Sequence, residues 1–90
     1  MRARVAIDVM LKDGILDPQG KTVEESLPSL GFQGVEGVRI GKHIELEVDG
    51  ETPEDIGSRV EEMTRRFLSN PVIEDFTYRI EDGSLSDGVR

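Results

Sequence analysis

The sequence predicts an α+β domain of two layers, in which an antiparallel sheet carries two helices on one face. Segments that alternate apolar and polar residues, as strands do, are interleaved with two segments whose apolar residues recur every three or four positions, as in helices. Each segment has one apolar face that must be buried against another element. The predicted order is strand, helix, strand, helix, strand. We expect oligomers to form through the sheet, whose open face and edge strands are available to a second copy.

Composition limits the size and the chemistry of this chain. Ninety residues make one domain, and the absence of cysteine removes disulfides, thiolate catalysis and cysteine zinc sites. With a single histidine and a net charge of −8, the chain is a poor candidate for a metal site or for binding nucleic acid or an anionic membrane. No long apolar run or signal sequence is present, so we expect a cytoplasmic protein.

The first strand is predicted over residues 4–12, where four aliphatic residues from Val5 to Leu11 share one parity. The first helix then begins with Asp17 as its N-cap and Pro18 in its first turn. Its apolar face consists of Val23, Leu27 and Leu30.

The end of the first helix contains a conflict. Pro28 lacks the N–H that would bond to the carbonyl of Glu24, so we expect a kink or a tightened last turn. Gly31 suits the left-handed position after the helix, with Phe32 folded back onto Leu27.

The middle strand is predicted over residues 38–48. Lys42 falls on the apolar face if the register is regular, so a bend or bulge is expected at Gly41-Lys42. One long bent strand and two short strands both satisfy this pattern. The apolar parity consists of Val38, Ile40, Ile44, Leu46 and Val48.

The second helix has the strongest signals. Thr52 is the expected N-cap, Pro53 follows it, and Asp55 is placed to complete a capping box. Asn70-Pro71 ends the helical pattern, and the last strand is predicted over residues 72–81, with Phe76, Tyr78 and Ile80 on one face. The domain therefore spans residues 1–81, and residues 82–90 are predicted to be a disordered tail. The apolar stripe of the second helix consists of Ile56, Val60, Met63 and Phe67, with Leu68 beside them.

Few residues suggest catalysis. Glu45 and Glu47 lie two apart on the polar face of a strand, where carboxylates are usually solvated. His43 has no serine, cysteine or metal-ligand partner in the sequence, and the glycines fit no phosphate-binding motif. Lys21 follows a glycine at a helix start, but the charge of Asp17 would repel a phosphate there. We therefore predict no catalytic, cofactor-binding or metal-binding residue in the isolated chain.

Three segments, in order and at matching separations, resemble the PurS family, the small subunits of formylglycinamidine ribonucleotide (FGAM) synthase. They are Leu11-Lys12 with Ile15 to Lys21, Val38 to Lys42, and Asn70 to Phe76. The resemblance covers residues 3–81. It implies a non-catalytic subunit of an ATP- and glutamine-dependent ligase in purine biosynthesis, one that bridges a synthetase (PurL) and a glutaminase (PurQ) and supports ammonia transfer for the conversion of FGAR to FGAM.

The resemblance also implies a homodimer or homotetramer, and a complex that uses ATP and Mg while this chain alone binds neither. On this basis we expect partner contacts in two regions, the turn at the start of the first helix and the basic stretch that begins the middle strand. The residues expected at these contacts are Asp17, Gln19, Lys21, Arg39, Lys42 and His43.

Two alternatives stay open on the sequence alone. One is a small regulatory domain that binds an amino acid or nucleotide at a dimer interface, as ACT-like domains do. The other is a minimal enzyme of acylphosphatase type, which would need an arginine in an anion-binding loop. The segment after the first strand, Lys12-Asp13-Gly14, contains no arginine, so this alternative is the weaker of the two.

Overall fold

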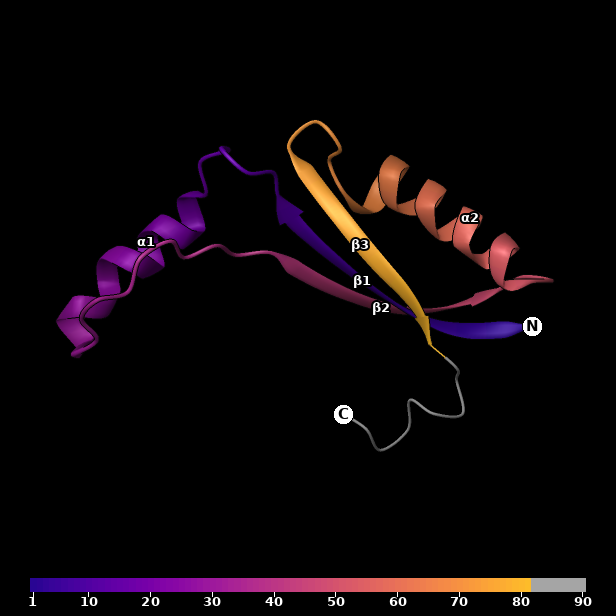
Figure 1. The fold of residues 1–90 in the computed structure, drawn as a ribbon, viewed down its shortest axis with the longest axis horizontal. Helices are drawn as coiled ribbons and strands as arrows, with labels where there is room; N and C mark the ends of the chain where they lie inside the picture. Colours follow the sequence, from indigo (N-terminus) through magenta and orange to yellow (C-terminus); the bar gives the residue numbers. More distant parts are fainter. Residues whose placement is uncertain (82–90) are drawn as a thin grey trace.

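The computed structural model describes residues 1–81, which form five main elements in the predicted order (Figure 1). The predicted disordered tail over 82–90 lies outside the described residues. The elements are β1 (Arg2–Leu11), α1 (Pro18–Ser26) with a 3-10 turn (Leu27–Leu30), β2 (Lys42–Asp49), α2 (Pro53–Met63) with a π-helical turn (Thr64–Leu68), and β3 (Glu74–Glu81).

The three strands form an antiparallel sheet in the order β2-β1-β3. β1 is central because its apolar parity is continuous, and Val5, Ile7 and Val9 are fully buried. Opposite Ile7 lie Ile44 on β2 and Tyr78 on β3, so the apolar parity of all three strands falls on one face. The predicted antiparallel α+β class is confirmed.

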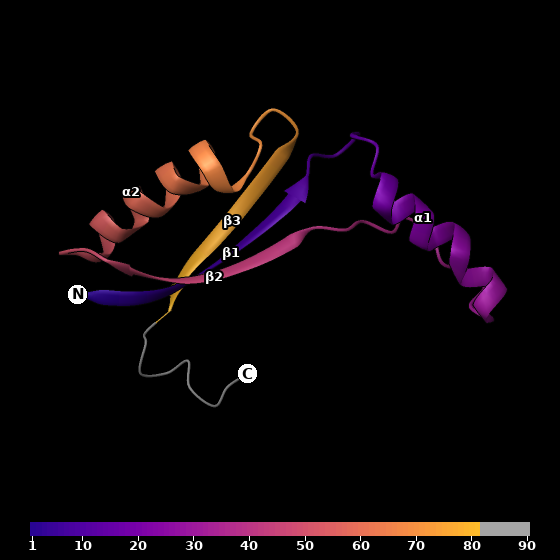
Figure 2. The same cartoon turned by 180° about the vertical axis from the view of Figure 1, so that it is seen from behind.

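Helix α2 covers that apolar face (Figures 1 and 2). Thr52 caps it as predicted, because its hydroxyl accepts the Asp55 N–H at 3.1 Å. The Asp55 carboxylate accepts the N–H of Glu51, one residue before the predicted capping-box partner. Ile56 and Val60 are fully buried against the sheet, so most of the predicted stripe is confirmed.

Phe67 was wrongly predicted to be part of that stripe, whereas Leu68 beside it packs on the core as predicted. Thr64–Leu68 is π-helical, and the Ser69 N–H bonds to the Thr64 carbonyl five residues earlier. A π turn adds one residue to the helical repeat, which rotates the following side chains. Leu68 therefore packs on the core, whereas Phe67 is 86% exposed.

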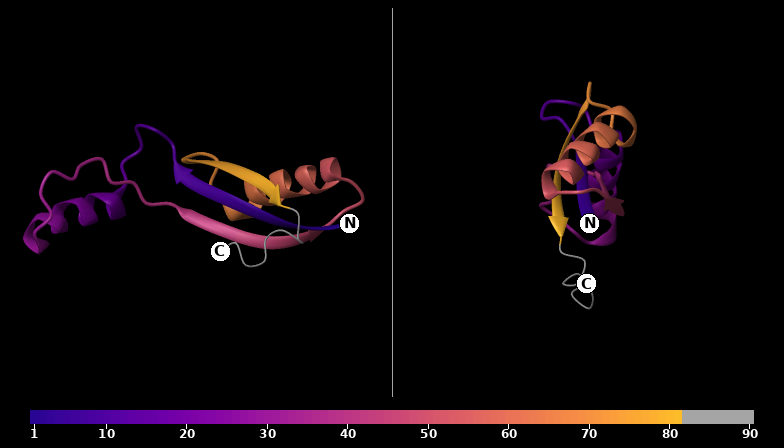
Figure 3. Two further views of the ribbon diagram at one scale, coloured as in Figure 1. Left: turned by 60° about the horizontal axis from the view of Figure 1, so that its bottom comes forward. Right: turned by 90° about the vertical axis from the view of Figure 1, so that its right-hand side faces the viewer.

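Helix α1 does not lie on the sheet, contrary to the expectation that both helices cover one face. It lies beyond the end of the sheet, in a projection formed by residues 12–41 that we call the arm (Figure 3). The chain is accordingly elongated, with extents of 51 × 34 × 15 Å. Within the arm α1 is bonded to the chain that returns beside it, and the apolar face of the sheet is covered by α2.

The expected tightening at Pro28 is confirmed, since the last turn is a 3-10 helix. Gly31 is left-handed at φ 98°, its N–H bonds to Pro28, and the Phe32 N–H bonds to Leu27. These two bonds form a Schellman motif, which satisfies the last carbonyls of the helix.

The middle strand is shorter than predicted, and neither of the two expected forms is found. β2 begins at Lys42 with a regular register, and residues 38–41 lie outside any strand. Gly41 permits this start, because a Cβ atom there would lie 2.4 Å from the carbonyl oxygen of Val9. The last strand also begins two residues later than predicted, at Glu74.

Candidate functional site

The six predicted contact residues fall into two neighbouring groups at the junction of the arm with the sheet. Asp17, Lys21 and Arg39 line a pocket of about 320 Å³ at the base of the arm. Gln19 is exposed on the first turn of α1. The other two residues, Lys42 and His43, are exposed at the start of β2.

Asp17 joins the outgoing segment of the arm, at the start of α1, to the segment that returns towards β2. Its carboxylate accepts the Gly20 N–H at 2.8 Å, as an N-cap, and the Ile40 N–H at 2.7 Å. The bond from Ile40, followed by that from Gly20, lowers the pKa of Asp17 below its ordinary value. The carboxylate is therefore ionised at neutral pH and has its acceptors directed into the arm.

Two further residues of α1 contact the returning chain, and neither role was predicted from the sequence. The Glu24 carboxylate accepts the N–H groups of Gly37 and Val38 at 3.0 and 3.2 Å. Gly20 is buried, and a Cβ atom there would lie 2.2 Å from the Val38 carbonyl oxygen. Contacts across 13 to 18 residues of irregular chain leave no periodic signal that could have revealed them.

Arg39 fastens the returning chain to the end of β1. Its guanidinium donates to the Leu11 carbonyl and lies 3.6 Å from the Asp13 carboxylate. Asp17 and Arg39 thus fix the direction of the arm, in addition to any contact that they make with another molecule.

The arm leaves many apolar side chains uncovered. Single exposed apolar residues are ordinary, whereas several on one projection are typical of an interaction surface. The exposed large apolar residues of the arm are Ile15, Leu16, Val23, Leu30, Phe32 and Val35.

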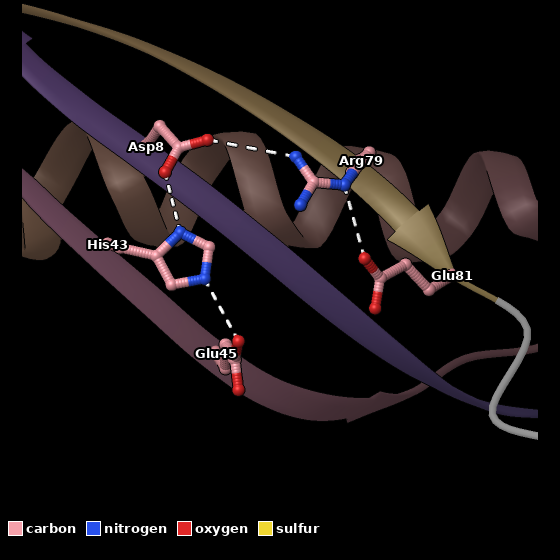
Figure 4. A network of polar contacts seen from close by, with 5 residues as sticks. All are labelled: Asp8, His43, Glu45, Arg79 and Glu81. Atoms are coloured by element: carbon pink, nitrogen blue, oxygen red, sulfur yellow. Dashed lines mark hydrogen bonds and ion pairs between the residues drawn. The ribbon is translucent and has the colours of Figure 1, made fainter. Parts of the chain in front are cut away.

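Of the second group, His43 belongs to a polar network on the sheet face opposite α2 (Figure 4), and Lys42, opposite Val9, has the other parity of β2. His43 lies between two carboxylates, with Nδ1 2.6 Å from Asp8 and Nε2 3.0 Å from Glu45. Asp8 is also 3.7 Å from Arg79, which bonds to Glu81. The bond to Asp8, followed by that to Glu45, raises the pKa of His43.

This arrangement links all three strands but has no catalytic geometry. His43 has carboxylate partners on both ring nitrogens and no nucleophile beside it, so its imidazole links the carboxylates of Asp8 and Glu45. Among residues 1–81 no group of three or more metal-ligating side chains is placed to hold an ion. No helix in the described part of the chain is both long and apolar enough to cross a membrane.

The sequence and fold of this chain match those of one protein family. The family model for PurS, described as phosphoribosylformylglycinamidine (FGAM) synthase, matches residues 4–82. The chain belongs to the PurS family. It is 40% identical to the Bacillus subtilis synthase subunit PurS over 79 residues, which are 88% of this chain and 93% of that protein. It is 44% identical to the Mycobacterium leprae subunit over 75 residues, 83% of this chain and 91% of that one.

Solved PurS structures share the fold. The Bacillus subtilis PurS structure superposes with a TM-score of 0.79 at 40% identity, covering 91% of this chain and all of that chain. A chain from the structure of PurLQS from Thermotoga maritima gives a TM-score of 0.81 at 33% identity, covering 90% and 99%. The resemblance inferred from the sequence is confirmed, and the chain is an FGAM synthase subunit of purine biosynthesis rather than its catalytic part. The ACT-like alternative is not favoured.

Proposed function

We propose that this chain bridges a PurL-type synthetase and a PurQ-type glutaminase in the cytoplasm and supports the passage of ammonia between them during conversion of FGAR to FGAM. The observation that carries the proposal is the close match, over nine-tenths of the chain, to a chain of the PurLQS structure. The complex uses ATP and Mg, and this chain binds neither alone. A bridging subunit needs contact surfaces and no nucleophile, which suits the polar network and the uncovered arm.

The proposed partner contacts are the base of the arm and the start of β2. Here Asp17, Lys21 and Arg39 come together, with the exposed Gln19 beside them. Lys42 and His43 follow directly on the edge strand. A region held by several internal bonds is already ordered before binding, which lowers the entropic cost of association.

We also propose that the chain assembles as a homodimer or homotetramer through the sheet. Both β2 and β3 have one unpaired edge within the described chain. The apolar side chains of the arm would add contact area to that assembly.

The test is FGAM formation by the PurL-type and PurQ-type enzymes of the same organism, with and without this chain. Glutamine and an ammonium salt are compared as nitrogen sources. We expect the chain to be required with glutamine and to matter much less with ammonium, because free ammonia does not need a path between two active sites. Equal rates with and without the chain, for both nitrogen sources, would contradict the proposal.

A further inference from the structure

Phe67 is the most exposed large apolar residue of the described chain, at 86%. The position four residues after Met63 would face the core in a regular α-helix, and the π turn moves Phe67 away from it. Leu68 packs against the core and Thr64 is fully buried, so the π turn still contacts the sheet while Phe67 is exposed. π turns of this kind occur frequently at functional sites.

Phe67 borders an open groove of about 470 Å³ along α2 and the π-helical turn. Aromatic residues, methionine and arginine are the types enriched in protein interfaces, and arginine and aromatic anchors contribute most of the binding energy there. Methionine adapts its shape to a partner surface. The other residues that line this groove are Arg59, Glu62, Met63 and Arg66.

The charged groups around Phe67 are held in place. Arg66 pairs with Glu62 at 2.9 Å, and Arg59 donates to the Asp49 carbonyl at 2.6 Å. Two guanidinium groups and one carboxylate leave this groove positively charged, on a chain whose net charge is −8. An acidic surface would therefore be attracted to this groove and repelled by most of the rest of the molecule.

We propose that the groove around Phe67 is a docking site for a partner protein that offers an apolar socket edged by carboxylates. The inference rests on the proposed function, since the partner belongs to one of the two enzymes that the chain bridges. A second copy of the chain fits less well. A two-fold contact of this groove with itself would bring together two grooves that each have two arginines and one glutamate, so their net positive charges would oppose each other.

The test measures binding of the full chain to the purified synthetase and glutaminase by titration calorimetry, with glutamine and Mg-ADP present. We expect Phe67→Ser to weaken binding to one of the enzymes by about 30-fold, the loss typical of an interface anchor. Val72→Ser is the matched control, because Val72 is 79% exposed and does not border the groove. Arg66→Glu is expected to weaken binding and to reduce its dependence on salt.

The outcomes separate this proposal from the proposed function. If the wild-type chain binds and Phe67→Ser binds equally well, the docking site is wrong and the bridging role stands. If Phe67→Ser changes only the oligomeric state of the chain alone, the groove joins copies of the chain and the proposal is overturned. If the wild-type chain binds neither enzyme, the proposed function fails and the docking site with it. An unchanged melting temperature of Phe67→Ser excludes unfolding as the cause of weaker binding.

Discussion

Single residues show how charge is used on the open face of the sheet. His43 and Asp8 come from neighbouring strands in register, and Glu45 follows on the same strand face as His43. A protonated imidazole relieves the repulsion between the two carboxylates, whereas a neutral one does not. Arg79 approaches Asp8 from the other side and also bonds to Glu81. The pairing of β1 with β2 is thus coupled to one titration.

The pH dependence of stability follows from that coupling. Because the pKa of His43 is raised in the folded chain, its stabilising effect is complete below the ordinary value and is lost as pH rises through the raised value. We expect the melting temperature of the wild type to exceed that of His43→Gln at pH 6, and the difference to shrink towards pH 9. Thermal unfolding at low salt measures this. A difference that is constant across the range would contradict the coupling.

Elements depend on capping groups that the sequence signals clearly. Replacing Thr52 with alanine removes the acceptor for the Asp55 N–H, and we expect a loss of about 1 kcal/mol in the free energy of unfolding. Urea denaturation measures the loss. Thr22→Ala is the control, because that hydroxyl bonds to the Pro18 carbonyl inside α1, and surface changes of this kind stay within about 0.5 kcal/mol. Equal effects of the two substitutions would show that the cap contributes nothing specific.

Local signals explain which elements could be predicted. Thr52 with Pro53, Asp17 with Pro18, and Gly31 after Pro28 are short-range patterns whose geometry is decided within one helical turn, and each was correctly predicted. The π turn was not predictable, because Met63 and Phe67 have a normal helical spacing. Its effect depends on tertiary packing, since Thr64 is fully buried and Leu68, rather than Phe67, packs on the core after the turn.

In the candidate site too, local contacts could be predicted from the sequence and long-range contacts could not. The helix start at Asp17 was predicted, but its second bond, to the N–H of Ile40, spans 23 residues. The arm therefore could not be foreseen from periodicity, which indicates that α1 has an apolar face without indicating what covers it. The family resemblance supplied the function, because no residue pattern in a chain without a catalytic centre could have done so.

In the elongated molecule the arm lies beyond the sheet, and many of its apolar side chains are exposed. We expect the wild-type chain to self-associate, and Leu30→Asp to raise the dissociation constant at least tenfold, since burial of one leucine contributes about 1.5–3 kcal/mol. Sedimentation equilibrium measures this. Ser29→Asp adds the same charge at the neighbouring exposed position and serves as the control. If Leu30→Asp and Ser29→Asp behave alike, the apolar contacts of the arm do not drive assembly.

The central place of β1 has a consequence for how the chain folds. Arg4 pairs with Glu81, 77 residues later, so the sheet cannot be completed until β3 has been made. Contacts between segments so distant in sequence form slowly, typically in milliseconds to seconds. The arm adds little to this delay, because each doubling of a closed loop costs only about 0.6 kcal/mol. During synthesis, the edge of β1 that pairs with β3 therefore stays unpaired until β3 has been made, and in this interval chaperones would protect the nascent chain.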